Sequence, residues 1–129
     1  MQYALLVYAP HDGTEPGDTE PGDTERGGTG RARRLMPGTL AALLDRPHVT
    51  GWTRLHADES ATTLRNGDGQ ALLTDGPFID SKEYLAGLIL IEADNLDGAL
   101  AIAEEMLQQT RPGTAIEVRP ILDGRVRAA

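Results

Sequence analysis

Residues 74–93 read TDGPFIDSKEYLAGLILIEA, and this stretch sets the architecture of the chain. A tight polar turn, Asp75-Gly76-Pro77-Phe78, leads within a few residues into an almost unbroken apolar run, residues 84–93. Successive side chains of a β-strand point to opposite faces. The run therefore predicts a strand with two apolar faces, one formed by Leu85, Ile89 and Ile91 and the other by Ala86, Leu88 and Leu90.

A second strand of the same kind lies at the start of the sequence. Residues 2–8 are rich in strand formers, and Pro10 is predicted to end the strand. Its two faces are again both apolar, with Tyr3, Leu5 and Val7 on one and Ala4, Leu6 and Tyr8 on the other. We therefore expect both strands to lie in a sheet that is covered on its two faces, with a polar cleft at its edge.

Helix and turn signals predict the elements between these strands. A first helix is expected from about Pro37 to Arg46, and extended structure resumes over residues 49–56. The dipeptide Asn66-Gly67 predicts a β-hairpin between residues 61–65 and 70–74, because both of its residues tolerate a positive φ.

The last third of the chain predicts one more helix and one more strand. Asp94 or Asn95 caps the helix, and residues 115–121 form the final strand. The apolar stripe of the helix is predicted to contain Leu96, Ala99, Leu100, Ala103, Met106 and Leu107.

This order of elements predicts an α+β protein with a ferredoxin-like sandwich. Two helices cover only one face of such a sheet, yet two strands are apolar on both faces. The economical cover for the second face is the same sheet from a second chain, related by a two-fold axis. A lid formed by residues 12–30 is the competing cover, but that segment has almost no apolar side chains. We therefore expect a homodimer that forms through the sheet face.

The 129 residues are expected to form one domain, residues 1–129, that contains a mobile acidic loop at about residues 12–30. This loop reads DGTEPGDTEPGDTERGGTG, and the Pro-Gly pair in each TEPGD unit prevents helix and ladder formation. Its carboxylates lack the spacing of an EF-hand, and GGTG lacks the lysine of a P-loop. Three histidines without paired spacing predict no metal site either. We expect no metal and no cofactor.

The charge and composition of the chain limit the classes of binding partner and the cellular compartment that we expect. A formal net charge of -8 argues against a nucleic-acid partner, since phosphates require a basic surface. The absence of cysteine fits a reducing compartment. Neither a signal peptide nor an apolar run long enough to cross a membrane is present. The sequence therefore predicts a cytoplasmic protein without a membrane partner.

Three segments of the sequence are similar to a known family. The start MQYALLVY, the stretch DGPFIDSKEYLAGLILIEADNLDGALAIA and the ending AIEVRPI together resemble the DGPF-type branch of the YCII-related proteins. The resemblance covers residues 1–10 and about 51–122. It implies a small bacterial protein with a dimeric α/β barrel of ferredoxin-like fold, and a link to a sigma factor of the extracytoplasmic-function type.

One feature of the wider family is not matched. A histidine near the head of the first helix and an aspartate after the second have been taken as a catalytic pair there. This sequence has Arg31, Arg33 and Arg34 near the first position and Thr110-Arg111-Pro112 at the second. The catalytic pair is therefore not carried over to this chain.

The candidate catalytic residues are Asp75 and His56. Asp75 either accepts backbone N–H groups of its own turn or acts as an acid or base at the mouth of a cleft. His56 follows the strand that begins at Val49, and an imidazole suits proton transfer. Lys82 either binds a small anionic ligand or is an ordinary surface lysine. The remaining candidates for contacts with a substrate are the aromatic side chains Phe78 and Trp52.

Two hypotheses for the function follow. The first is a small-ligand-binding or regulatory module, with a sigma factor as its partner. The second is a cofactor-independent enzyme of the lyase, isomerase or dehalogenase type that acts on a small acid through Asp75 and His56. Because the family's catalytic pair is missing, the sequence favours the binding module.

Overall fold

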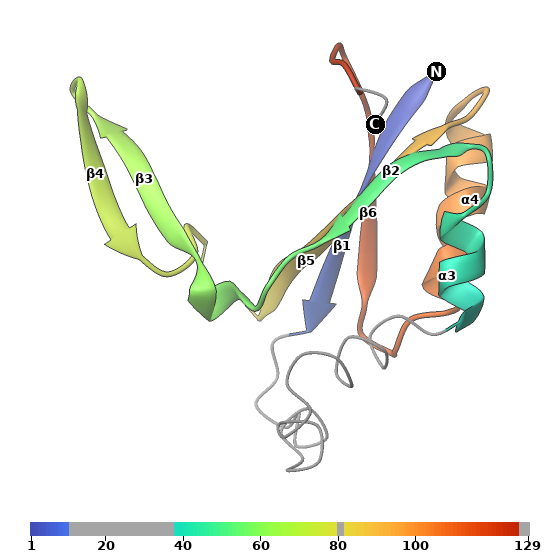
Figure 1. Cartoon of the computed structure of the whole chain (residues 1–129), viewed down its shortest axis with the longest axis horizontal. Coiled ribbons are helices and arrows are strands. Elements are labelled where there is room, and N and C mark those ends of the chain that lie inside the picture. Colours follow the sequence, from blue (N-terminus) through green and yellow to red (C-terminus); the bar gives the residue numbers. More distant parts are fainter. Residues whose placement is uncertain (11–37, 80–81, 127–129) are drawn as a thin grey trace.

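The computed structural model describes residues 1–10, 38–79 and 82–126 (Figure 1). The acidic loop predicted at residues 12–30 lies outside these ranges. The described elements, in chain order, are β1 (Gln2–Pro10), α3 (Gly38–Leu44), β2 (Val49–Arg54), the short 3₁₀ helix η2 (Asp58–Ser60), β3 (Thr62–Gly67), β4 (Gln70–Asp75), β5 (Glu83–Glu92), α4 (Leu96–Leu107) and β6 (Ala115–Pro120).

Four strands form the main sheet in the order β2-β5-β1-β6, and each neighbouring pair is antiparallel. The two strands predicted to be apolar on both faces, β1 and β5, are the central ones. Strands β3 and β4 form a separate two-stranded sheet. This mixed architecture confirms the predicted α+β class and is compatible with a ferredoxin-like fold.

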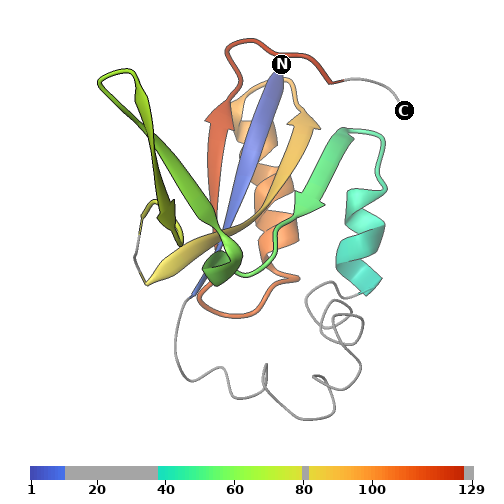
Figure 2. The same cartoon turned by 60° about the vertical axis from the view of Figure 1, so that its left-hand side comes forward.

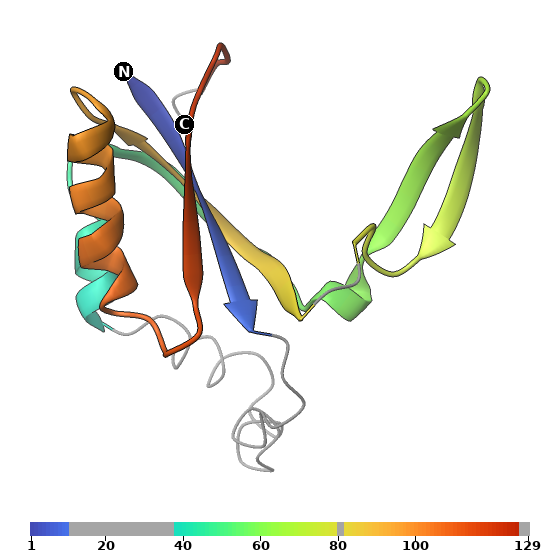
Figure 3. The ribbon, with the colours of Figure 1, turned by 180° about the vertical axis from the view of Figure 1, so that it is seen from behind.

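Both described helices cover the same face of the main sheet. In Figure 2 α4 lies behind the strands, and in Figure 3 α3 and α4 lie side by side on one side of the sheet. The sheet contributes Tyr3, Leu5, Ile89 and Ile91 to the core, all of them buried. The helices contribute Leu43, Leu44, Ala99, Ala103 and Met106. Among the described residues the core is therefore mainly aliphatic, with Tyr3 as an aromatic member, and it lies between the sheet and helices α3 and α4.

The apolar stripe predicted for α4 is correct for three residues and wrong for three. Ala99, Ala103 and Met106 are buried, whereas Leu96, Leu100 and Leu107 are exposed. Successive residues of an α-helix are about 100° apart, so these leucines lie on a flank of the helix beyond the core side. On the opposite flank Arg46 forms an ion pair with Glu105 at 3.0 Å, which links α4 to the end of α3.

Asn95 is the residue that caps α4. Its side-chain oxygen accepts a hydrogen bond from the Gly98 N–H at 2.9 Å, and its φ of -161° is extended. Of the two caps that the sequence allows, Asp94 and Asn95, the structure selects Asn95. Neither α4 nor α3, the α-helices of the described ranges, is long and apolar enough to cross a membrane.

A β-bulge changes the face to which Leu85 belongs. Val7 pairs with Gly87, but the next residue, Tyr8, pairs with Leu85, so that Ala86 is skipped. Tyr8 and Val7 point to opposite faces, and paired residues share a face. Leu85 therefore lies on the face of Tyr8 and not, as predicted, on the helix-covered face with Ile89 and Ile91. An extra residue in one strand reverses the alternation beyond it.

The predicted hairpin is confirmed, but its turn lies two residues later than Asn66-Gly67. Gly67 pairs with Gln70, which leaves Asp68 and Gly69 as the turn residues, with φ of 54° and 88°. Two positive φ values define a type I′ turn, for which Asp-Gly is as suitable as Asn-Gly. Asn66 instead accepts a hydrogen bond from the Gly69 N–H at 3.0 Å. The hairpin projects away from the main sheet (Figures 1 and 3).

Candidate functional site

The face of the main sheet opposite the helices carries an apolar strip. Because Leu5 and Ile89 are buried beneath the helices, their neighbours along β1 and β5 point the other way. We call this surface the open face and define it by Ala4, Leu6, Leu88 and Leu90, each of which is partly exposed. Within the described ranges, no helix or strand covers it (Figure 3).

A hollow of about 860 Å³ lies at one end of the open face. Three parts of the chain line it. The sheet contributes Tyr8 and Leu85, and the segment after β2 contributes Leu55, His56 and Asp58. The base of the hairpin and the connection after it contribute Thr63, Pro77, Phe78 and Ile79, and Glu83 lines the hollow from the start of β5. Since Tyr8 lies on the same face as Leu6, the hollow is continuous with the open face.

The turn after β4 positions the side of the hollow that the hairpin forms. Gly76 has a φ of 100°, which glycine adopts readily, and its N–H donates to the Ala61 carbonyl oxygen at 2.7 Å. The Thr63 hydroxyl donates to the Gly76 carbonyl oxygen at 2.8 Å. These two bonds close the base of the hairpin. The ring of Phe78 follows this turn and lies 5.2 Å from the Arg65 guanidinium carbon, within the range of a cation–π contact.

Polar side chains line the hollow from every wall. His56 and Asp58 lie on the segment after β2, and Glu83 begins β5. Both carboxylates take part in further interactions of their own. No lysine or arginine occurs among the lining residues of the described ranges. The walls are otherwise mainly apolar, so the hollow suits a small molecule with an apolar body and a few polar atoms.

Tyr8 contributes a polar group to the sheet wall of the hollow. Its hydroxyl donates to Glu117 Oε1 at 3.3 Å, from β1 to the neighbouring strand β6. Partial burial raises the pKa of Tyr8 above its usual value of 10.0, and the nearby charge and hydrogen bond of Glu117 raise it further. Tyr8 therefore remains a neutral hydrogen-bonding phenol at physiological pH.

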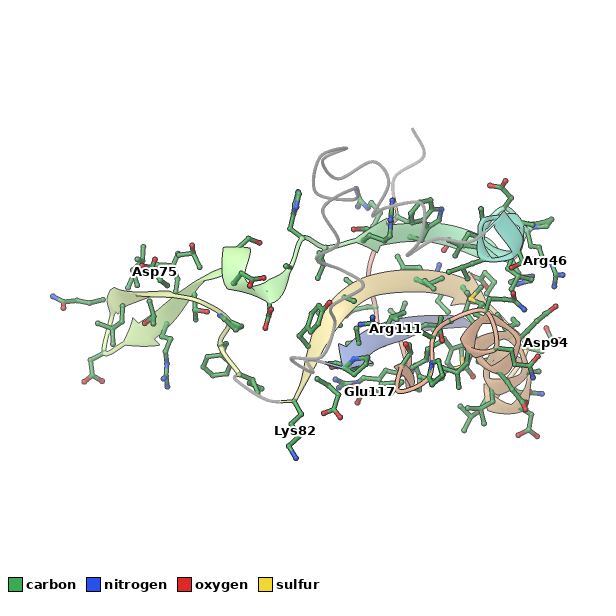
Figure 4. All side chains as sticks on the ribbon, turned by 90° about the horizontal axis from the view of Figure 1, so that it is seen from below. Arg46, Asp75, Lys82, Asp94, Arg111 and Glu117 are labelled. Carbon is green, nitrogen blue, oxygen red and sulfur yellow. The ribbon has the colours of Figure 1, made fainter. Side chains whose placement is uncertain are left out.

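The five predicted site residues are divided between the hollow and its surroundings. His56 and Phe78 line the hollow, whereas Asp75, Lys82 and Trp52 do not. In Figure 4 Asp75 lies on the hairpin, and the Lys82 side chain is directed outward from the start of β5. Trp52 pairs with Ile89 and therefore lies on the helix-covered side of the sheet. The structure thus brings His56 and Phe78 together but leaves Asp75 outside.

Sequence reasoning did not identify Tyr8, Asp58 and Glu83 as site residues. Tyr8 belongs to an apolar strand face, and the two carboxylates lie in short polar segments that have no distinctive spacing. Pairing of β1 with both β5 and β6 brings Tyr8 to the hollow. In the part of the chain that the structure describes, no group of three or more histidine or carboxylate side chains has the geometry for a metal ion.

Comparison with known proteins identifies the family. The family model of the YCII-related domain, which describes the sequences of that family, matches residues 1–123 of this chain. The chain therefore belongs to the YCII-related family. The chain is also 42% identical over 69 residues to R00369, an uncharacterized protein of Rhizobium meliloti (strain 1021). That match covers 53% of this chain and 55% of the relative, so it spans about half the length of each.

Proposed function

We propose that this protein is a cytoplasmic, homodimeric small-ligand-binding or regulatory module of the DGPF-type branch, with the hollow as its ligand site. The observation that carries the proposal is the continuity between the hollow and the open face. A ligand site and a surface that needs cover meet at Tyr8, on the central strand β1. A homodimer that forms through the sheet face would cover the open face and would also border the ligand site.

The dimer follows from the open face. Ala4, Leu6, Leu88 and Leu90 lie on the two central strands, and contiguous apolar surface of this kind marks interaction sites. A second copy packed face to face about a two-fold axis would cover the strip with an identical strip. Residues 12–30, the competing cover, have almost no apolar side chains. The dimeric α/β barrel implied by the family resemblance has this same arrangement.

The chemistry of the hollow indicates the kind of ligand. Its volume of about 860 Å³ falls within the range of about 300–1,000 Å³ that is typical of small-molecule sites. Phe78, Leu55 and Leu85 offer apolar and aromatic contacts, and His56 offers a hydrogen bond to a polar group of the ligand. Binding of an anion through Lys82 is not favoured by the geometry, because Lys82 lies outside the lining.

The dimer is tested by sedimentation velocity over a dilution series into the low micromolar range. We expect the wild-type protein to sediment as a dimer and Leu6→Glu, which places a charge on the open face, to sediment as a monomer. Leu100→Glu is the matched control, since Leu100 is an exposed leucine on the outer flank of α4. A wild-type monomer at these concentrations would refute the dimer.

The ligand site is tested by a thermal-shift screen of small aromatic and aliphatic metabolites. A ligand that stabilises the wild-type protein should lose most of its effect in Phe78→Ala and in His56→Ala, because both side chains line the hollow. Asp75→Ala, which alters a charged residue outside the lining, should leave the shift unchanged. Equal shifts in all variants would place the ligand elsewhere on the protein.

A second candidate function rests on His56. An imidazole beside an apolar pocket is a suitable general acid or base, so the hollow also fits a cofactor-independent lyase, isomerase or dehalogenase that acts on a small acid. Asp75, the proposed second group, would have to act from outside the described lining. The assay is turnover of a panel of small carboxylic acids, halogenated ones included. Loss of about 10²-fold or more in kcat for His56→Gln, with the fold intact, would support this function.

A sigma factor is the proposed regulatory partner, with the acidic segment at residues 12–25 as the contact surface. This proposal rests on the family resemblance and on the charge of that segment, whose six carboxylates would favour a basic partner. Co-purification with the purified sigma factor should be lost when residues 12–25 are replaced by a short Gly-Ser linker. Retention of the complex would reject the role of this segment.

A further inference from the structure

The hairpin of β3 and β4 is an isolated two-stranded sheet with exposed leucines. Its side chains Leu64, Leu72 and Leu73 are 65%, 51% and 67% exposed. In the described ranges neither strand pairs with a strand of the main sheet. A two-stranded hairpin is at best marginally stable in water unless one of its faces is covered. The hairpin therefore needs a partner surface.

The two faces of the hairpin can be distinguished. Thr63 lines the hollow, and Arg65 lies over Phe78, which also lines it. Alternation then assigns Thr63, Arg65 and, opposite Arg65, Leu72 to the face directed at the hollow and the main sheet. We call this the inner face. Leu64 and Leu73, which pair with each other, form the outer face.

Leu72 packs over Gly67 on the inner face. A methyl group added at Gly67 would lie 2.7 Å from Leu72 Cδ1, so the leucine side chain packs directly over the bare glycine backbone. Leu72 pairs with Arg65, whose guanidinium lies over the ring of Phe78. Leu72 and Phe78 are 51% and 65% exposed, so this side of the hairpin presents two large apolar side chains.

The inner face and the open face border the same space. The hairpin and the main sheet diverge from the start of β5 and leave an angle between them (Figure 1). Tyr8 and Leu85 of the sheet lie on one side of the hollow at the base of this angle, and Thr63 and Phe78 lie on the other. A second chain that rests on the open face next to the hollow would therefore lie opposite the inner face of the hairpin.

We propose that the hairpin is a dimerisation arm, which packs the inner face, through Leu72 and Phe78, against a second copy of the chain and closes the hollow between the two protomers. The proposal rests on the proposed homodimer. Stable interfaces bury about 800 Å² per partner, more than the partly covered side chains Ala4, Leu6, Leu88 and Leu90 can supply alone. The arm adds the missing contact surface, and a ligand in the hollow touches both chains.

The test compares two adjacent leucines that point to opposite faces. Leu72→Glu charges the inner face and Leu73→Glu the outer face, with identical changes in composition and net charge. We expect Leu72→Glu to raise the dimer dissociation constant at least about tenfold in sedimentation equilibrium, and Leu73→Glu to change it by less than about threefold. Circular dichroism and hydrogen exchange of β1 and β5 verify that both variants retain the main sheet.

Hydrogen exchange of the wild-type protein gives a second, mutation-free readout. On dilution below the dissociation constant, the amides of β3 and β4 should lose protection while those of β1 and β5 keep it. A dimer that is equally tight in both variants, with hairpin protection independent of dilution, would overturn the arm but leave the sheet-face dimer standing. Stronger weakening by Leu73→Glu would assign the contact to the outer face and also overturn the proposal. A monomeric wild-type protein would overturn the arm and the homodimer together.

Discussion

The hydroxyl of Tyr8 donates a hydrogen bond to Glu117 Oε1 at 3.3 Å and so connects β1 to β6 at the edge of the hollow. Partial burial, and then the charge and the hydrogen bond of Glu117, raise the pKa of the phenol. The folded state therefore holds this proton more tightly than the unfolded chain. The resulting contribution to stability is complete below a pH of about 10.0 and is lost as the pH rises through the pKa of the folded state.

The charge around Tyr8 predicts two pKa changes of opposite sign. Glu117→Gln removes a negative charge and should lower the pKa of Tyr8. Arg119→Gln removes a positive charge that lowers this pKa, and should raise it. The measurement is a tyrosinate absorbance titration, with Tyr8→Phe in the same background to isolate the Tyr8 signal. Shifts of the same sign in both variants would contradict this account of the site.

The close approach of β2 to β5 predicts that Gly87 cannot be replaced without cost. A Cβ at Gly87 would lie 2.7 Å from the Thr53 carbonyl oxygen, and this backbone atom cannot move without disturbing the strand pairing. Gly87→Ala should lower the free energy of unfolding by about 1–3 kcal/mol.

Gly51→Ala is the matched control for Gly87→Ala. At Gly51 the added carbon meets only Leu90 Cδ1, at 3.9 Å, which is an ordinary contact. Its effect should stay within about 0.5 kcal/mol. Urea unfolding followed by circular dichroism at one fixed protein concentration measures both variants. Equal effects would show that the Thr53 carbonyl does not limit this position.

Truncation of two adjacent side chains on α4 should lower the free energy of unfolding by very different amounts. Met106 is fully buried against the sheet, and Met106→Ala should lower the free energy of unfolding by about 2–5 kcal/mol, because the cavity left behind closes only partly. Leu107 is 36% exposed, and Leu107→Ala should cost less than half as much. Thermal unfolding at one fixed protein concentration compares the two. A larger loss for Leu107→Ala would contradict the orientation of the helix.

Sequence periodicity was sufficient for the main sheet because its central strands are unusually apolar. The alternation in residues 2–8 and 84–93 identified β1 and β5, and it also indicated that one face of the sheet would lack a cover. The bulge opposite Tyr8 has no such signature, since Leu85 and Ala86 are both apolar. Pairing between strands, which periodicity does not report, determines the side on which Leu85 lies.

Local sequence patterns do not predict the position of the hairpin turn or the residues that line the hollow, for two reasons. The tetrapeptide NGDG contains two suitable turn dipeptides, and only the pairing of Gly67 with Gln70 selects Asp68-Gly69. The hollow combines β1 with segments more than 40 residues further along the chain, so its lining depends on strand order. The chemistry of their side chains predicts His56 and Phe78 as site residues. Tyr8 matches the apolar alternation of a strand, so the sequence does not mark it as a site residue.

The N-terminus of α4 predicts different behaviour for two neighbouring polar residues. Asn95 accepts a hydrogen bond from the Gly98 N–H, and Asn95→Ala should lower the free energy of unfolding by about 1 kcal/mol, since that N–H would lose its partner. Asn95→Asp keeps an acceptor at the cap and should restore the stability. The measurement is thermal unfolding by circular dichroism at low and high salt.

Salt separates the role of Asn95 from that of Asp94. Within the described residues no hydrogen bond from Asp94 to the helix is seen, and its charge lies near the positive end of the helix dipole. The cost of Asp94→Ala, about 0.3–1 kcal/mol, should therefore shrink as salt screens that charge. The cost of Asn95→Ala comes from a lost hydrogen bond to a neutral side chain and should be nearly independent of salt. If the cost for Asp94→Ala were the larger of the two and insensitive to salt, Asp94 would be the capping residue in solution.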